Sequence, residues 1–198
     1  MEGAHVVLSL NAARVAVQAA TDALPGLPEG AVYADLNTGT PELKRELAEL
    51  VGTRFVDVAL LGPVPMRGLE TRALASGPAA HAFAGMLGPL GMPVEVVSDR
   101  AGDAAAMKLV RSVFTKGLAA AILESMRAAE GVGCEAWLAD EIAEVIGAPY
   151  LERLIEGSRK HAARRVDEMD AAASLLVELG VEPRVANASA AVLTDLAD

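Results

Sequence analysis

Cysteine and histidine are scarce in this chain of 198 residues, and their scarcity removes whole classes of function. The single cysteine, Cys134, excludes an intrachain disulfide and a metal site built from several cysteines. The three histidines are scattered without the spacing of metal ligands, so we expect no metal site. We interpret Cys134 as a small core or helix-start residue and assign it no chemistry.

Positive charge and long apolar runs are lacking as well. The chain has 17 lysines and arginines against 27 acidic residues, a formal net charge of −10, which argues against a nucleic-acid partner. No apolar run approaches the roughly 18 residues of a membrane span, and the N-terminus lacks the basic start of a signal peptide. We therefore expect a cytoplasmic protein with no membrane partner.

Hydrophobic residues make up 53% of the chain, which suffices for a packed core in one domain or two small ones. In the first half, short runs rich in Val and Leu alternate with helically spaced segments. The expected strands are residues 5–11, 31–37, 54–62, 71–77 and 94–99, and the expected helices are residues 12–24, 40–52 and 78–91. This alternation predicts an α/β layer with a mainly parallel sheet.

The pattern changes at Gly102. From Asp103 onward the apolar spacing is helical throughout, with breaks at glycine and proline and no convincing strand. The first of these helices is long, at about residues 103–130. We therefore predict an α/β domain over residues 1–101 and an all-helical domain over residues 102–198, connected by a long interdomain helix.

One face of that long helix is polar and cationic although its surroundings are apolar. At 100° per residue its polar side chains fall within about 140° of arc; they are Lys108, Arg111, Ser112, Thr115 and Lys116. Burying unpaired charges costs several kcal/mol each, so the face must meet water, carboxylates or an anionic ligand. Because the helix follows the last strand, we expect this face near the carboxyl ends of the strands, in a cleft between the two halves.

Five separated segments resemble one known family. They are "YADLNTGTP", "FVDVALLGPVP", "ASG", "GDAAAMKLVRSVFTKG" and "RKHAARRVDEMDAAASLLVELGVEP". Their order is similar to that of the β-hydroxyacid dehydrogenase superfamily, and more narrowly to 6-phosphogluconate dehydrogenase-like proteins with a distinct C-terminal helical domain. The resemblance covers nearly the whole chain. It implies that residues 1–101 form a truncated Rossmann-type domain and that the activity is NAD(P)-dependent oxidoreduction of a small anionic hydroxy or carbonyl compound.

The resemblance also implies roles for individual residues. Lys108 matches the family's catalytic lysine, which accepts the hydroxyl proton and returns it in the reverse direction. Ser112 stands where many relatives have a substrate-binding asparagine, so one hydroxyl replaces the fork of an amide. The loop of Asn37, Thr38 and Gly39 matches the one that holds the substrate.

Gly62 matches the first glycine of a Ser-Gly-Gly substrate loop whose serine and second glycine are here Leu61 and Pro63. This departure indicates a substrate unlike that of the standard enzymes. Arg111 and Lys116 either contact the anionic substrate or form structural pairs. As like charges, both favour a neutral amine at Lys108.

In this family the cofactor's nicotinamide end lies near the residues that match Ser9, Leu10 and Asn11. The family's Gly-rich turn, whose N–H groups hold the pyrophosphate, has no counterpart here, because no G-x-G-x-x-G occurs in the chain. We therefore expect this truncated chain to bind NAD(P) poorly and to be inactive or weak alone.

The densest basic stretch is residues 158–165, "SRKHAARR". It is either a solvated helix face paired with acids or a set of cations that reaches an anion-binding cleft, including one of a second subunit. The long apolar helices of the second half favour a homodimer through a shared helical interface.

Three functions follow from these observations. The first is the dehydrogenase-like oxidoreductase, with Lys108 as general acid/base. The second is an isomerase, a lyase or an anionic-metabolite-binding protein that uses the same cleft without a cofactor. The third is a dimerisation module without catalysis. Thr115 is counted among the candidate substrate-binding residues, although a threonine within a helix more often bonds its own helix backbone than a ligand.

Overall fold

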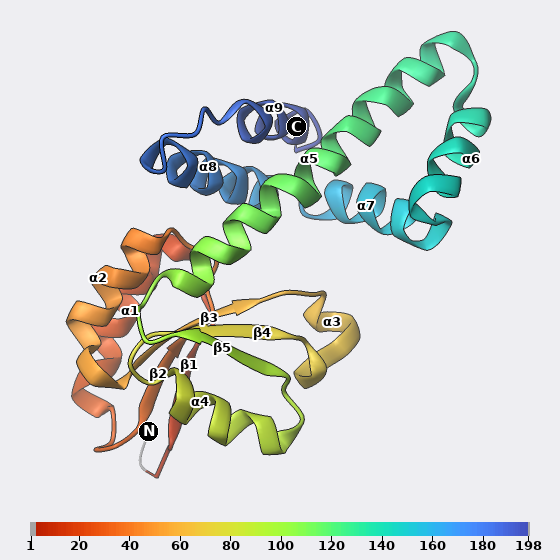
Figure 1. The fold of residues 1–198 in the computed structure, drawn as a ribbon. Helices are drawn as coiled ribbons and strands as arrows, with labels where there is room; N and C mark the ends of the chain where they lie inside the picture. Colours follow the sequence, from red (N-terminus) through yellow and green to blue (C-terminus); the bar gives the residue numbers. More distant parts are fainter. Residues whose placement is uncertain (1–2, 198) are drawn as a thin grey trace. The chain divides into compact units, whose positions relative to one another are not determined.

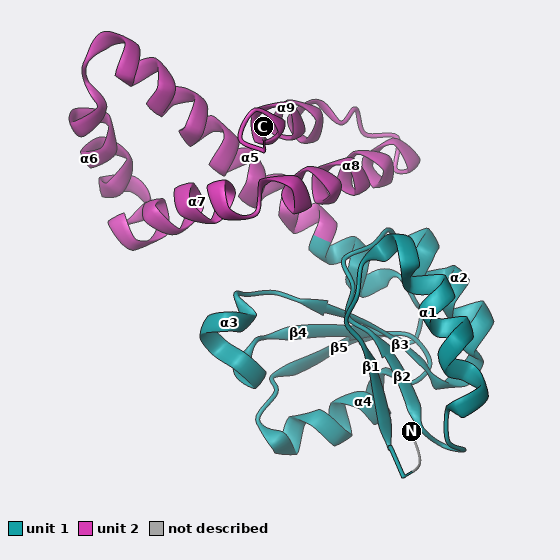
Figure 2. Cartoon of the chain, turned by 180° about the vertical axis from the view of Figure 1, so that it is seen from behind, with its two compact units in different colours: residues 1–108 teal, residues 109–198 magenta. Residues whose placement is uncertain are grey.

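The computed structural model describes residues 3–197, and these form two compact units. Unit 1 is Met1–Lys108 and unit 2 is Leu109–Asp198 (Figure 2). The division falls within the long helix, beyond the expected boundary at residues 101 and 102, because the first turns of that helix pack on the sheet of unit 1, where Ala104 contacts Ala59 and Leu74.

Unit 1 is built on a five-stranded sheet in the order β1-β2-β3-β4-β5 (Figure 1). Its strands are β1 (Val6–Ser9), β2 (Val32–Asp35), β3 (Phe55–Leu60), β4 (Ala73–Ser76) and β5 (Val94–Ser98). All neighbours are parallel except β3 and β4. The predicted α/β class, with a mainly parallel sheet followed by a helical second half, is confirmed. The antiparallel pair is a feature that the alternation of helices and strands did not predict.

Helices cover both faces of the sheet. Unit 1 contains α1 (Ala16–Ala23), α2 (Pro41–Val51), α3 (Val64–Arg67) and α4 (Ala80–Leu87). Short 3-10 turns occupy Ala13–Val15, Leu24–Gly26, Gly52–Arg54, Gly68–Glu70 and Gly88–Leu90. Helix α2 begins as predicted, since the Thr40 side chain accepts a hydrogen bond from the Leu43 N–H and Pro41 takes the first helical position.

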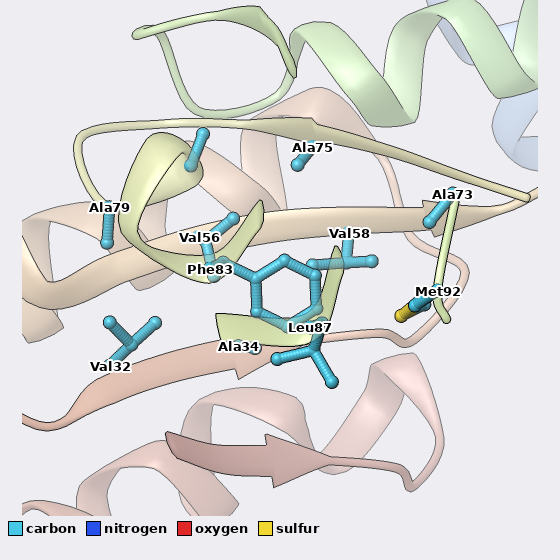
Figure 3. Packing of buried hydrophobic residues seen from close by; sticks show 11 residues of the cluster. Val32, Ala34, Val56, Val58, Ala73, Ala75, Ala79, Phe83, Leu87 and Met92 are labelled. Carbon is cyan, nitrogen blue, oxygen red and sulfur yellow. The ribbon is translucent and has the colours of Figure 1, made fainter. Parts of the chain in front are cut away.

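Two apolar cores fill the spaces between sheet and helices. Phe83 and Leu87 of α4 pack on alternate residues of β2 and β3, among them Val56 and Val58 (Figure 3). The intervening residues of the same strands, such as Tyr33 and Phe55, face α1 and α2. This two-residue alternation fixes which strand side chains meet α2.

Unit 2 is helical throughout its described part. Helix α5 runs from Asp103 to Val132 and is followed by α6 (Glu135–Ile146), α7 (Ala148–Lys160), α8 (Ala162–Glu178) and α9 (Arg184–Thr194). An apolar cluster that includes Ile122 and Leu154 joins α5 to α6 and α7. In the described part of the chain, no helix combines the length and apolar character that a membrane crossing needs.

Candidate functional site

A row of buried polar residues crosses the sheet of unit 1. In the strand register, Ser9 of β1 is paired with Asp35 of β2, Asp35 with Asp57 of β3, and Asp57 with Ser76 of β4. Asp35, Asp57 and Ser76 are completely buried and Ser9 nearly so. Two carboxylates thus lie side by side in the buried interior, where like charges repel and an unpaired ion is costly.

Lys44 of α2 neutralises this pair of carboxylates. Its Nζ lies 2.5 Å from Asp35 Oδ2 and 3.2 Å from Asp57 Oδ1, and its side chain is 1% exposed. Nζ also donates to the Asn37 carbonyl oxygen at 2.8 Å. Burial alone would lower the pKa of Lys44, but Asp57 and Asp35 outweigh it, so the pKa is raised above the ordinary 10.5. The ammonium therefore stays protonated and ties α2 to two strands.

The same row receives the first turn of α5. Ser76 Oγ accepts from the Ala104 N–H and Asp57 Oδ2 accepts from the Ala105 N–H, both at 3.0 Å. Ser76 Oγ in turn donates to Asp57 Oδ2 at 3.2 Å. The first N–H groups of a helix have no partner within the helix, and a carboxylate there is favoured by the helix dipole. Asp57 thus fixes where α5 begins.

Beyond the row, Asn37 joins the loops that follow β1 and β2. Its Oδ1 accepts from the Asn11 N–H at 2.6 Å, and its Nδ2 donates to Ser9 Oγ at 3.1 Å and to Asn11 Oδ1 at 2.9 Å. Asn37 is 6% exposed. Three residues predicted from the sequence, Ser9, Asn11 and Asn37, therefore lie together and hold one another in place.

Lys108 meets the loop after β2. Its Nζ donates to Thr38 Oγ1 at 2.7 Å, and both residues are half-buried. The adjoining Gly39 lies so close to α2 that a Cβ there would be 2.8 Å from Leu43 Cδ2. The lysine comes from the first turns of α5 and the hydroxyl from the loop after β2, so the tertiary fold brings an amine and a hydroxyl together from segments that are 70 positions apart.

Two other residues of unit 1 that were predicted to belong to the site are exposed to solvent in loops. Leu10 is 68% exposed, and Gly62 is exposed in the loop after β3. A Cβ on Gly62 would be only in ordinary contact with Thr71. Their proposed roles therefore stay predictions from the resemblance.

The remaining predicted residues lie in unit 2, around Glu168 of α8. Ser112 Oγ donates to Glu168 Oε1, and Lys116 Nζ lies 2.9 Å from the same oxygen. Burial lowers the pKa of Lys116 below its ordinary 10.5, which the contact with Glu168 offsets only in part. Ser112 is completely buried and Glu168 is 5% exposed. In unit 2, pairing with the Glu168 carboxylate neutralises part of the positive charge on the polar face of α5.

Arg111 and Thr115 differ from that pair. Arg111 is exposed. The Thr115 Oγ1 is buried and, among the residues that the structure describes, has no hydrogen-bond partner. The expectation that Thr115 bonds its own helix is therefore wrong. A buried hydroxyl without a partner costs stability, and such groups call for an explanation.

The basic stretch is largely solvated. Arg159, Lys160 and Arg164 are exposed, whereas Arg165 turns inward and donates to Ser158 Oγ. Local burial and then the neighbouring cations lower the pKa of His161.

The sequence analysis did not identify the charged residues at the centre of the two polar groups, which are Asp35, Asp57 and Lys44 in unit 1 and Glu168 in unit 2. Asp35 and Asp57 each follow a buried aromatic residue by two positions, so alternation along the strands places both on the side of α2. Lys44 lies one helical turn before the buried Leu47, on the inner side of α2. These signals are present, but only the strand register shows that the three residues meet. Glu168 has no comparable signal.

Comparisons with known proteins agree with this architecture. Residues 129–196 match a family model described as a domain of unknown function, DUF1932. An uncharacterised 28.5 kDa protein of Methanothermus fervidus is 29% identical over 146 residues, which are 70% of this chain and 55% of that protein. The chain thus spans about half the length of this curated relative.

Two solved structures are similar over almost the whole chain. The conserved protein MTH1747, of unknown function and described as structurally similar to 3-hydroxyacid dehydrogenases, is 30% identical with a TM-score of 0.75, over 96% of this chain and 74% of that one. The Mycobacterium tuberculosis 3-hydroxyisobutyrate dehydrogenase, solved with L-serine, is 19% identical with a TM-score of 0.77, over 98% and 75%. The second likeness shows the fold alone.

Proposed function

Because this chain belongs to the β-hydroxyacid dehydrogenase superfamily, we propose that it forms the substrate-handling part of an NAD(P)-dependent oxidoreductase acting on a small anionic hydroxy or carbonyl compound. The observation that carries the proposal is the 2.7 Å contact between Lys108 Nζ and Thr38 Oγ1 beside the buried polar row. An amine and a hydroxyl held together at the edge of an α/β sheet are suited to proton transfer at a substrate oxygen.

In this proposal Lys108 is the general acid/base. Its Nζ accepts the proton of the substrate hydroxyl during oxidation and returns it to the carbonyl oxygen during reduction. Thr38 Oγ1 orients the amine, and the neighbouring Asn37 fixes the loop. A bound nicotinamide supplies or accepts the hydride.

The described residues fit only one end of a dinucleotide. The amide and hydroxyl groups of Ser9, Asn11 and Asn37 suit the carboxamide of a nicotinamide, while the turn after β1 has no glycine and its Asn11 N–H already bonds Asn37. A pyrophosphate needs several free N–H groups at a helix start. We therefore propose that this chain binds NAD(P)H weakly.

An anionic substrate is supported by the cations of α5. Arg111 is exposed and is the candidate ligand for an anion, whereas the Thr115 hydroxyl is buried. Ser112 and Lys116 would bind an anion only by giving up contacts with Glu168. A cytoplasmic location stays a prediction from the sequence.

The test uses the protein with NAD⁺ or NADP⁺ in large excess and the probes 3-hydroxyisobutyrate and L-serine. We expect dinucleotide reduction with at least one short hydroxy acid of this kind and a loss of 100-fold or more, as for removal of a general acid/base (about 10²–10⁴-fold), in Lys108→Met. Lys160→Met, an exposed lysine of unit 2, is the matched control and should keep the activity.

Unchanged turnover in Lys108→Met would refute the role of the amine. If NADPH does not bind the protein at any concentration in a fluorescence titration, the proposal is wrong. The alternative of an isomerase, lyase or metabolite-binding protein without a cofactor would then be favoured.

We also propose that unit 2 forms a homodimer through α6 and the hollow beside it. Helix α6 packs Ile142 and Ile146 against the apolar cluster of α5 and α7. Two of its other large apolar residues face outward, since Trp137 is 61% and Val145 84% exposed. Exposed large apolar side chains of this kind are typical of an interaction surface.

A hollow adjoins α6. It has a volume of about 240 Å³ and is lined by Leu123, Met126, Arg127, Glu130, Glu135, Ile155, Arg159 and Leu196. Four of these residues are apolar, two are cations and two are acids, so the hollow offers a second copy both apolar contact and charges of either sign. A stable interface needs about 800 Å² from each partner.

Sedimentation velocity and the fluorescence of Trp137, the single tryptophan, test this dimer. We expect a dimer whose emission shifts to the red on dilution, and a monomer in Trp137→Asp at the same concentration. Val177→Asp on α8, a residue that is 63% exposed, is the control and should remain dimeric. A wild-type monomer at all concentrations would refute the proposal.

A further inference from the structure

Lys44 contacts the loop that carries Thr38. Its Nζ donates to the Asn37 carbonyl oxygen at 2.8 Å and to the Asp35 carbonyl oxygen at 3.2 Å. The Asn37 carbonyl belongs to the peptide unit that leads directly into Thr38. The ammonium therefore restrains the backbone of the loop itself, in addition to pairing with a carboxylate.

The same ammonium acts on the start of α5. Asp57 Oδ1 lies 3.2 Å from Lys44 Nζ, while its other oxygen accepts from the Ala105 N–H at 3.0 Å. Ala105 precedes Lys108 by three residues, which is less than one helical turn. A carboxylate held by Lys44 thus sets the position and rotation of the turn that presents the Lys108 amine.

We propose that Lys44 is a positioning residue that holds Thr38 and Lys108 in contact through these two connections. One connection runs from Nζ to the Asn37 carbonyl, and the other runs through Asp57 to α5. This proposal rests on the proposed role of Lys108. The competing explanation is that Lys44 only neutralises Asp35 and Asp57 and has no effect on Lys108 beyond general stability.

The decisive variant removes the contacts that Lys44 makes with the Asn37 carbonyl and with Asp57 without changing the net charge of the buried group. Lys44→Met combined with Asp35→Asn removes one positive and one negative charge, so the cluster keeps its net charge. It retains Asp57, keeps an oxygen at position 35 to accept from the Asn37 amide, and loses the ammonium that binds the Asn37 carbonyl. If charge balance alone matters, Lys108 behaves in this variant as in the wild type.

The experiment measures how fast acetic anhydride labels Lys108, relative to the exposed Lys160 in the same molecule, by mass spectrometry of the peptides. Thr38→Val shows how much the labelling rate of Lys108 changes when the hydrogen bond between Thr38 and the amine is lost. We expect both Thr38→Val and the double variant to label Lys108 about 5–10-fold faster, the change that corresponds to losing one hydrogen bond. Arg45→Met on the exposed side of α2 should leave the rate unchanged.

The proposal is overturned if the double variant labels Lys108 at the wild-type rate while Thr38→Val does not. It is also overturned if Lys44→Met lowers the thermal midpoint and Lys108 reactivity stays constant below the transition. The labelling needs neither cofactor nor substrate. A failure of the oxidoreductase proposal therefore shows in the turnover assay and leaves this result readable.

Discussion

Replacing Lys44 by Met should be among the most damaging single substitutions in unit 1. Met has a similar length, so the change removes the ammonium with little change in volume. It leaves Asp35 and Asp57, both completely buried and paired in the strand register, without their counter-charge. Breaking a buried ion pair by removing one partner costs about 3–5 kcal/mol. This is a large fraction of a typical folding free energy of about 5–15 kcal/mol.

Urea unfolding at pH 7, followed by circular dichroism, measures this loss. The single tryptophan, Trp137, monitors unit 2 separately. The matched control is Arg45→Met, which removes a cation from the next position of α2, where the pair with Glu42 is exposed, and should cost less than about 1 kcal/mol. Adding Asp35→Asn to Lys44→Met should recover at least about 1 kcal/mol, because residues in contact couple.

A loss below about 1 kcal/mol in Lys44→Met, with an unchanged urea dependence, would refute this reasoning. It would mean that the repulsion between the two carboxylates is weak, or that water reaches and solvates them in the folded state. The charge argument would also be wrong if Lys44→Met and the double variant were equally unstable.

Three further predictions follow from individual residues. The pKa of Lys44 is raised above 10.5 in the folded state, so the stability that its ammonium contributes is fully present below about pH 10.5 and is lost as the pH rises through the raised pKa. The difference in unfolding free energy between wild type and Lys44→Met should therefore shrink in urea titrations at alkaline pH. A difference that stays constant would contradict this prediction. Gly102→Ala should destabilise by about 2 kcal/mol or more, because φ is +98° and a Cβ would lie 2.8 Å from the Pro41 oxygen, whereas Gly85→Ala, in open space on α4, should be neutral or stabilising in the same thermal scan. His161 should titrate below 6.5 in an NMR titration, since local burial and the flanking cations disfavour its charged form, and a midpoint at or above 6.5 would show that these cations are screened.

The elements of both halves were predictable because each is set by local sequence. The apolar alternation of residues 31–37 and 54–62 corresponds to β2 and β3, and Thr40 with Pro41 marks the observed start of α2. The long helix from Asp103 was expected to reach Glu130 and ends at Val132. The direction of β4 was not predictable, because a strand has the same pattern whichever way it pairs.

The candidate site was predicted only in part. Resemblance placed Asn37, Thr38 and Lys108 in one functional group, and the structure brings the last two into contact across 70 positions of the chain. It did not reveal Lys44, because a lysine within a helix such as "PELKRELAELV" is normally solvated. Pairing of Ser112 with Glu168 was equally absent from the sequence pattern.

The sequence by itself determined the order and type of the elements, the change from α/β to helical structure near Gly102, and the polar face of the long helix, because these depend on spacing within a short segment. Only the tertiary structure decided which polar groups pair. Asp35 and Asp57 become neighbours through the register of two strands, and Lys44 reaches them because α2 packs on that side of the sheet. Such contacts depend on distances between segments far apart in the chain, which no local pattern contains.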